Sequence, residues 1–214
     1  MNKKQKLIYN ELVSKYDFNL FQKYQIKIGL ENNVDVFIYA KPDFDFRQMS
    51  EIRNGLEKGY NISDYIKTDF NNSQMNEIRK GLEHSLNVSV YAKPEFDNHQ
   101  MEQIRRGLER NLDVSIYAKT EFDWAQMGLI RLGLKNNLDV SIYATPEFKY
   151  EQMNQIYPGL DKNLNVSIYA NPEFNNMQMY QIRIGLENNI DVTPYLNPGI
   201  DWKEMERIRL ELES

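Results

Sequence analysis

The sequence predicts an all-α protein: an α-solenoid of about seven 26-residue helical-hairpin repeats that follows an N-terminal capping helix. Three observations predict this fold class. The 214-residue chain has a strict internal period, each period contains one apolar helical stripe, and helix-capping residues flank that stripe. One repeat is too small to bury its own apolar stripe, so we expect neighbouring repeats to stack on one another.

The period is visible in three columns of recurring residues. Glycine recurs every 26 residues, isoleucine lies three residues before each glycine, and tyrosine lies ten residues after it. The glycines are Gly29, Gly55, Gly81, Gly107, Gly133, Gly159 and Gly185. No insertion or deletion breaks this register, which is typical of a stacked array and not of an ordinary globular domain.

Residues 1–20 lack the repeat motif but have a helical pattern of their own. Leu7, Ile8, Leu12 and Val13 are spaced as on one face of a helix. We therefore expect residues 1–20 to form an N-terminal capping helix and residues 21–214 to form a single solenoid domain.

The first element of each repeat is predicted to be an α-helix, illustrated here by residues 97–110. Asp97 and Gln100 have the spacing of a capping box, in which two side chains satisfy free amides at a helix start. The apolar stripe that follows consists of Met101, Ile104 and Leu108. Asn111 comes next, and asparagine tolerates the left-handed conformation that ends many helices.

The second element, residues 112–118, is ambiguous. Its apolar residues alternate, which would suit a strand and a horseshoe similar to the leucine-rich repeats. The column of Ile116, however, also contains Asp64 and Pro194. Proline in a buried strand removes a ladder hydrogen bond, whereas proline in a first helical turn removes none. We therefore predict a short second helix, either α or 3₁₀.

Composition excludes several classes of function. There is no cysteine, so disulfides, thiolate metal sites and cysteine nucleophiles are excluded. His84 and His99 are the two histidines, and they stand in different columns without a cluster of partners. No apolar run reaches the roughly 18 residues that a membrane span requires. We expect a cytoplasmic protein that is not an enzyme, with no catalytic residues, cofactor, metal site or membrane contact.

One string of the repeat carries a resemblance. It reads Gln-Met-x-x-Ile-Arg-x-Gly-Leu-Glu and then Asp-Val-Ser-x-Tyr-Ala-x-Pro-x-Phe, as from Gln100 to Phe122 with threonine at the proline position. It resembles an uncharacterised short repeat in hypothetical proteins of Firmicutes, including those on phages and conjugative elements. The resemblance covers residues 22–213. It implies an interaction array, such as a phage or mobile-element inhibitor protein, and supplies no catalytic residues.

The departures from the repeat predict where a partner protein binds. On a helical wheel, the face opposite the apolar stripe holds the columns of His99, Gln103 and Arg106, and later repeats place apolar residues on this face or beside it. Solenoids bind through such variable positions, and grouped exposed apolar residues mark partner surfaces. The predicted contacts are Trp124, Leu129, Leu132, Tyr150, Tyr157, Tyr180 and Ile184. Contact within a superhelical turn, or with a second copy of the chain as a homo-oligomer, is an equal alternative.

Pro158 is further expected to kink or fray its helix.

A second hypothesis assigns nucleic-acid binding to a column of arginines. The column consists of Arg53, Arg79, Arg105, Arg131, Arg183 and Arg209. One arginine per repeat could follow a phosphate backbone. Acidic residues lie four positions later in most repeats, however, within pairing distance on the same helix face. The net charge is also −5. We therefore favour a structural ladder, meaning a row of arginines neutralised by acidic side chains of the same chain, over arginines that contact phosphate.

Three other columns are expected to be structural. The methionines lie on the apolar stripe and should pack in the core. The tyrosine rings should pack between repeats, with the hydroxyl at a carbonyl or at water. The glycines should allow close approach of a neighbouring helix, which would offset the roughly 1 kcal/mol that glycine costs in a helix.

Overall fold

The computed structural model describes residues 1–63 and 65–214, and all regular secondary structure in these residues is helical. The chain divides into two compact units, unit 1 (residues 1–109) and unit 2 (residues 110–214). Unit 1 contains α1 (Lys3–Lys15), α2 (Leu20–Glu31), η1 (Val36–Ile38), α3 (Phe46–Glu57), α4 (Asn72–Glu83), η2 (Val88–Val90) and α5 (Asn98–Leu108). Unit 2 contains η3 (Val114–Ile116), α6 (Trp124–Lys135), η4 (Val140–Ile142), α7 (Tyr150–Asp161), η5 (Val166–Ile168), α8 (Asn176–Glu187), η6 (Thr193–Tyr195) and α9 (Trp202–Glu213).

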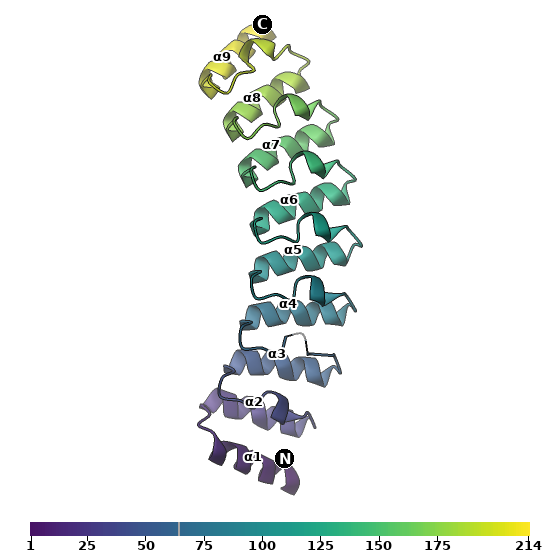
Figure 1. Cartoon of the computed structure of the whole chain (residues 1–214), viewed down its shortest axis with the longest axis vertical. Coiled ribbons are helices and arrows are strands. Elements are labelled where there is room, and N and C mark those ends of the chain that lie inside the picture. The colour runs from purple at the N-terminus through teal and green to yellow at the C-terminus, as the bar shows by residue number, and fades with distance from the viewer. Residues whose placement is uncertain (64) are drawn as a thin grey trace. The chain divides into compact units, whose positions relative to one another are not determined.

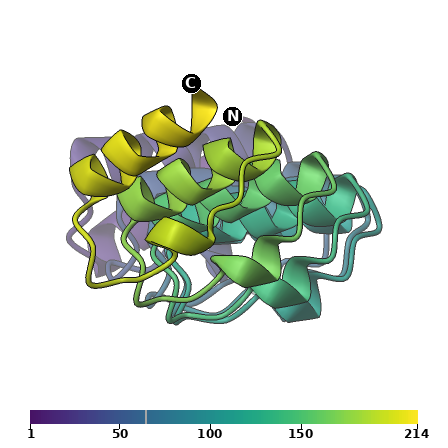
Figure 2. The same ribbon diagram turned by 90° about the horizontal axis from the view of Figure 1, so that it is seen from above.

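Within each unit, every long helix packs against the next one along the chain (Figure 1). In unit 2 the long helices form one row, and the short elements lie together on one side of that row (Figure 2). This arrangement confirms the prediction of an all-α helical-repeat solenoid. The helix α1 lies within residues 1–20 and packs on α2.

The second element of the repeat is a single turn of 3₁₀ helix, as in Val114–Ile116. The structure thus confirms a short helix and excludes a strand at this position in the described repeats. Pro194 lies within the 3₁₀ turn Thr193–Tyr195, where its missing N–H costs nothing. Asp64, the other residue that argued against a strand, lies outside the described residues.

Capping at both ends of the long helices follows the predicted pattern. The Asp97 side chain accepts hydrogen bonds from the amides of His99 and Gln100 at 2.7 and 2.8 Å, and Gln100 Oε1 accepts one from the Asp97 amide at 2.8 Å. Asn111 has a φ of 54°, and five other residues of its column, with Gly59, share this left-handed conformation. Local sequence therefore sets where each long helix begins and ends.

The capping glutamine also joins neighbouring repeats. Gln74 is buried, and its Nε2 donates to the carbonyl oxygens of Phe96 at 2.7 Å and Pro94 at 3.1 Å. These carbonyls belong to the loop that precedes the next long helix, so one side chain fixes the start of α4 and the entry to α5. Equivalent bonds are made by Gln22, Gln48, Gln126, Gln152 and Gln178.

The tyrosine of each repeat occupies the space that the glycine of the same repeat leaves open. The Tyr91 ring is fully buried, and its hydroxyl donates to the Glu77 carbonyl at 3.1 Å, as predicted. Burial raises the pKa of Tyr91, so the hydroxyl keeps its proton. A Cβ at Gly81 would lie 2.0 Å from that hydroxyl. The glycine therefore makes room for a tyrosine of its own repeat, and the prediction that it admits a neighbouring helix is wrong.

Pro158 does not fray its helix. α7 extends over twelve residues, the same length as α6 and α8, with Pro158 inside it. The missing N–H would have bonded to the carbonyl of Asn154, one turn earlier. Because Asn154 is exposed, water can satisfy that carbonyl.

Lys149 is an imperfect helix cap, and its replacement by asparagine should stabilise unit 2. It occupies the N-cap of α7, but its side chain accepts no hydrogen bond from the helix amides, whereas Asn175 caps α8. We expect Lys149→Asn to add about 1 kcal/mol to the free energy of unfolding, measured by urea denaturation. The control Asn175→Lys should remove a similar amount, and a neutral result for both variants would contradict this account of the cap.

Candidate interaction surface

Exposed large apolar side chains gather at the starts of the long helices, at their first, second and fifth positions. We call this the helix-start face. In unit 2 it carries Trp124 and Tyr150 at the first positions of α6 and α7, with Met177 and Tyr180 at the second and fifth positions of α8. The Trp124 side chain is 52% exposed. These four residues form the unit 2 patch.

Unit 1 has a patch at the same repeat positions. Leu20, Phe21 and Tyr24 occupy the first, second and fifth positions of α2, and all three are exposed, Leu20 to 81%. The Phe21 ring lies 5.0 Å from that of Phe46 at the start of α3. The later helices α4 and α5 instead have polar residues at these positions. They are Asn72, Ser73, Asn76, Asn98, His99 and Glu102.

Sequence reasoning missed the unit 1 patch, although a signal was present. Leu20 and Phe46 stand in the same column as Trp124 and Tyr150, 104 residues earlier in each case. The contacts predicted from the sequence lie in the later repeats, on or beside the wheel face opposite the core. The column at the first helical position would have found both patches.

The structure places the predicted partner-binding residues in three environments. Trp124, Tyr150 and Tyr180 are exposed. Leu132, Tyr157 and Ile184 are partly exposed. Leu129 is only 7% exposed, so the prediction that it lies on an open face is wrong.

Leu129 is buried because its column faces the next helix of the stack. The equivalent residue of α8, Gln181, is also buried, and its Oε1 accepts a hydrogen bond from Arg209 Nε of α9 at 3.0 Å. The Gln103 column therefore lies between helices, and the wheel was wrong to place it on the exposed side.

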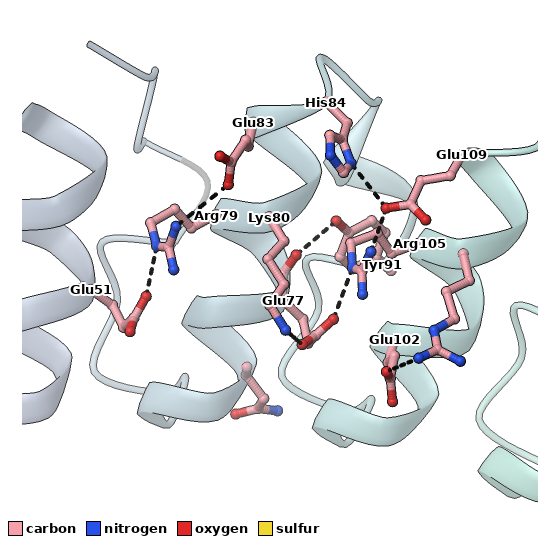
Figure 3. A network of polar contacts seen from close by, with 12 residues as sticks. Glu51, Glu77, Arg79, Lys80, Glu83, His84, Tyr91, Glu102, Arg105 and Glu109 are labelled. Atoms are coloured by element: carbon pink, nitrogen blue, oxygen red, sulfur yellow. Dashed lines mark hydrogen bonds and ion pairs between the residues drawn. The ribbon is translucent and has the colours of Figure 1, made fainter. Parts of the chain in front are cut away.

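This buried column pairs with the arginine column 28 residues later. In unit 1, Arg105 Nε donates to Glu77 Oε2 at 2.9 Å, and Arg105 Nη1 forms an ion pair with Glu109 (Figure 3). Glu77 also binds Lys80 Nζ at 2.6 Å. One repeat earlier, Arg79 Nε binds Glu51 at 2.8 Å. Three further arginines bind a glutamine at this position: Arg53 with Gln25, Arg183 with Gln155, and Arg209 with Gln181.

The paired arginines are largely enclosed. The Arg105 and Glu77 side chains are each 9% exposed. Burial disfavours the charge on Arg105, but the hydrogen bond and the negative charge of Glu77 raise the pKa of Arg105 overall, so the guanidinium keeps its charge. A guanidinium engaged by carboxylates of its own chain presents little charge to a phosphate. The geometry thus supports a structural ladder at Arg53, Arg79, Arg105, Arg183 and Arg209 more than a nucleic-acid track.

One contact of this series, between α6 and α7, is made by different residue types. Leu129 and Tyr157 occupy the two paired positions, 28 residues apart, where other repeats have Gln or Glu with Arg. The Tyr157 hydroxyl accepts a hydrogen bond from Asn136 Nδ2 at 2.7 Å. Tyr157 therefore replaces the arginine, and Leu129 replaces the polar side chain that would have bound it. This double replacement leaves no unpaired charge between α6 and α7.

Neither a metal site nor a membrane-spanning helix is present in residues 1–63 and 65–214. No three His, Asp or Glu side chains in these ranges come close enough together to hold a metal ion. None of the helices described above is long and apolar enough to cross a membrane. Comparisons with protein-family models, with curated proteins and with solved structures found no match to this chain.

Proposed function

We propose that this chain is a non-enzymatic repeat scaffold that binds another protein through the helix-start face of unit 2. The observation that carries the proposal is the exposure of Trp124, Tyr150 and Tyr180 on one face of a repeat array whose core columns are uniform. Uniform columns hold the fold and cannot distinguish one partner from another, so recognition falls to the residues that vary. A phage or mobile-element inhibitor, which the repeat resemblance implies, would be a scaffold of this kind.

The side-chain chemistry of the patch suits a protein partner. Tyrosine and tryptophan provide large apolar area with few rotatable bonds, and they are enriched among the residues that dominate binding energy at protein interfaces. Apolar patches of this kind mark interaction sites when they are grouped on one side of a protein. The patch lies on consecutive packed helices of one unit, so its residues are presented by a rigid frame.

A displayed peptide library offers a direct test, with peptides selected on the intact chain. We expect the selected peptides to lose affinity about a hundredfold or more for a triple variant, Trp124→Ala with Tyr150→Ala and Tyr180→Ala, because such anchors contribute on the order of 1–2 kcal/mol each. Helicity and melting temperature should barely change, because all three side chains are exposed.

The matched control is Phe37→Ala, which removes an exposed aromatic ring of unit 1 outside the helix-start face. It should leave the affinity of the selected peptides unchanged. Peptides that bind the triple variant as well as they bind the original chain would refute the proposal. A salt-sensitive complex with single-stranded nucleic acid that survives the triple substitution would replace it with the nucleic-acid hypothesis.

A further inference from the structure

The helix α2 has a second apolar stripe on the face opposite its core stripe. Phe21, Tyr24 and Ile28 recur at the i, i+3 and i+7 spacing that places side chains on one helix face. Phe21 is 63% exposed, Tyr24 is 58% exposed, and Ile28 is half-buried. The long helices that follow in unit 1 have polar residues at these positions, so the repeat fold does not require the second stripe. They are Arg47, Ser50 and Asn54 in α3, Ser73, Asn76 and Lys80 in α4, and His99, Glu102 and Arg106 in α5.

The start of α2 is also more positively charged than the start of any later repeat helix. Residues 15–27 contain Lys15, Lys23 and Lys27 with a single acidic residue, Asp17. In each of the seven equivalent stretches of the later repeats, from residues 41–53 to residues 197–209, acidic residues equal or outnumber basic ones. The excess of positive charge is therefore particular to α2.

These three lysines are not neutralised by carboxylates of their own chain. The one ion pair formed within the described residues 1–47 joins the terminal amine to Glu31 at 3.5 Å. Lys15 lies over the ring of the neighbouring Tyr16, 5.1 Å from its centre. Lys15 and Lys27 are exposed, and Lys23 is partly exposed. In contrast to the arginines of the structural ladder, the lysines present their charge to the surroundings.

We infer that this surface of unit 1 binds an acidic amphipathic helix of a partner protein. We call the surface, formed by the second stripe of α2 and the three lysines, the α2 site. The inference goes beyond the function proposed above, because it adds a second site in the other unit. Apolar side chains of the partner helix pack on the stripe, whose spacing is that of a seam between two helices. Carboxylates beside that seam bind the lysines, and this charge complementarity selects acidic partners over basic ones.

The test measures the fluorescence anisotropy of two labelled amphipathic peptides with the intact chain at physiological ionic strength. One peptide has leucine on one helix face and glutamate and alanine on the others, and the second has lysine in place of glutamate. We expect the acidic peptide to bind and the basic peptide not to bind. Phe21→Ser with Tyr24→Ser should weaken binding about thirtyfold or more, because aromatic anchors dominate such interfaces. Both side chains are exposed, so helicity should not change.

The contribution of charge is tested by Lys15→Gln with Lys27→Gln. This variant should weaken binding of the acidic peptide about fivefold, as expected for two ion pairs at the edge of an interface. The matched control is Lys58→Gln with Lys67→Gln, which removes the same charge from exposed lysines of unit 1 that follow α3. The control should change the affinity less than about twofold, because salt screens charges that lie away from the peptide.

Two results of these measurements would overturn the inference. Equal losses from the two lysine variants would reveal non-specific attraction of the chain to acidic peptides. A single-stranded oligonucleotide that displaces the acidic peptide, with an affinity that falls steeply as salt is added, would assign the lysines to phosphate contact.

The triple variant of unit 2 separates the two proposals. Trp124→Ala with Tyr150→Ala and Tyr180→Ala should bind the acidic peptide with unchanged affinity, because the α2 site lies in unit 1. Loss of acidic-peptide binding in that variant would place the peptide on unit 2 and overturn the α2 site. In the peptide selection described above, peptides that depend on Phe21 and Tyr24 belong to the α2 site, and the remaining peptides test the unit 2 patch. Failure of one proposal therefore leaves the other standing.

Discussion

Gly81→Ala is expected to destabilise unit 1 by about 3 kcal/mol, although alanine in a helix is ordinarily better than glycine by about 1 kcal/mol. The added Cβ would lie 2.0 Å from the Tyr91 hydroxyl and 2.9 Å from a methyl carbon of Val88. The Tyr91 ring is fully buried, so the ring, the backbone or the η2 turn must shift. Urea denaturation followed by circular dichroism measures the loss.

Removing the hydroxyl should rescue this variant in part. Tyr91→Phe alone is expected to cost about 1 kcal/mol, since it deletes the hydrogen bond to the Glu77 carbonyl. In the Gly81→Ala, Tyr91→Phe double variant the nearest ring carbon lies 3.2 Å from the new Cβ, a contact that small shifts relieve. The double variant should therefore be more stable than Gly81→Ala alone. Simple additivity of the two losses would contradict the steric explanation of the glycine column.

Glu77→Leu is expected to lower the stability of unit 1 by about 3–5 kcal/mol, the usual cost of breaking a buried ion pair from one side. Arg105 Nε loses its carboxylate while the guanidinium remains enclosed between α4 and α5. Glu109 on the same helix keeps its ion pair with Arg105, but it cannot reach both sides of the guanidinium. The measurement is again the free energy of unfolding in urea.

A second substitution, at Arg105, should restore the stability that Glu77→Leu removes. Glu77→Leu with Arg105→Tyr reproduces in unit 1 the Leu129 and Tyr157 pair of unit 2. Replacing both members of a buried ion pair by packed side chains is often neutral or stabilising, so we expect the double variant to recover most of the loss. His84 stands 21 residues before Arg105, as Asn136 stands before Tyr157, and can bind the new hydroxyl. A double variant as unstable as Glu77→Leu alone would show that the two positions are not coupled.

The elements that depend on neighbouring residues along the chain could be predicted from the sequence alone. The capping box at Asp97 and Gln100 and the left-handed Asn111 act within one or two turns, so their spacing is sufficient to locate the helix between them. Repetition strengthens these local signals because each is present in several repeats at the same phase. The proline at position 194 was also sufficient to favour a short helix over a strand. Of the candidate site, the sequence identified Trp124 and Tyr150 at the first helical position and Tyr180 beside the face opposite the apolar stripe, and all three are exposed.

The side chains that lie between the repeats could be identified only from the packing of the helices. A helical wheel with one apolar stripe assumes one buried face, whereas a helix inside a stack is also enclosed on two flanks, by the preceding and the following helix. That is why Leu129 is buried, and why Arg105 finds Glu77 in the preceding repeat besides Glu109 on its own helix. Partners about 28 residues apart meet only after stacking has fixed the distance between helices, and no local pattern in the sequence contains that distance.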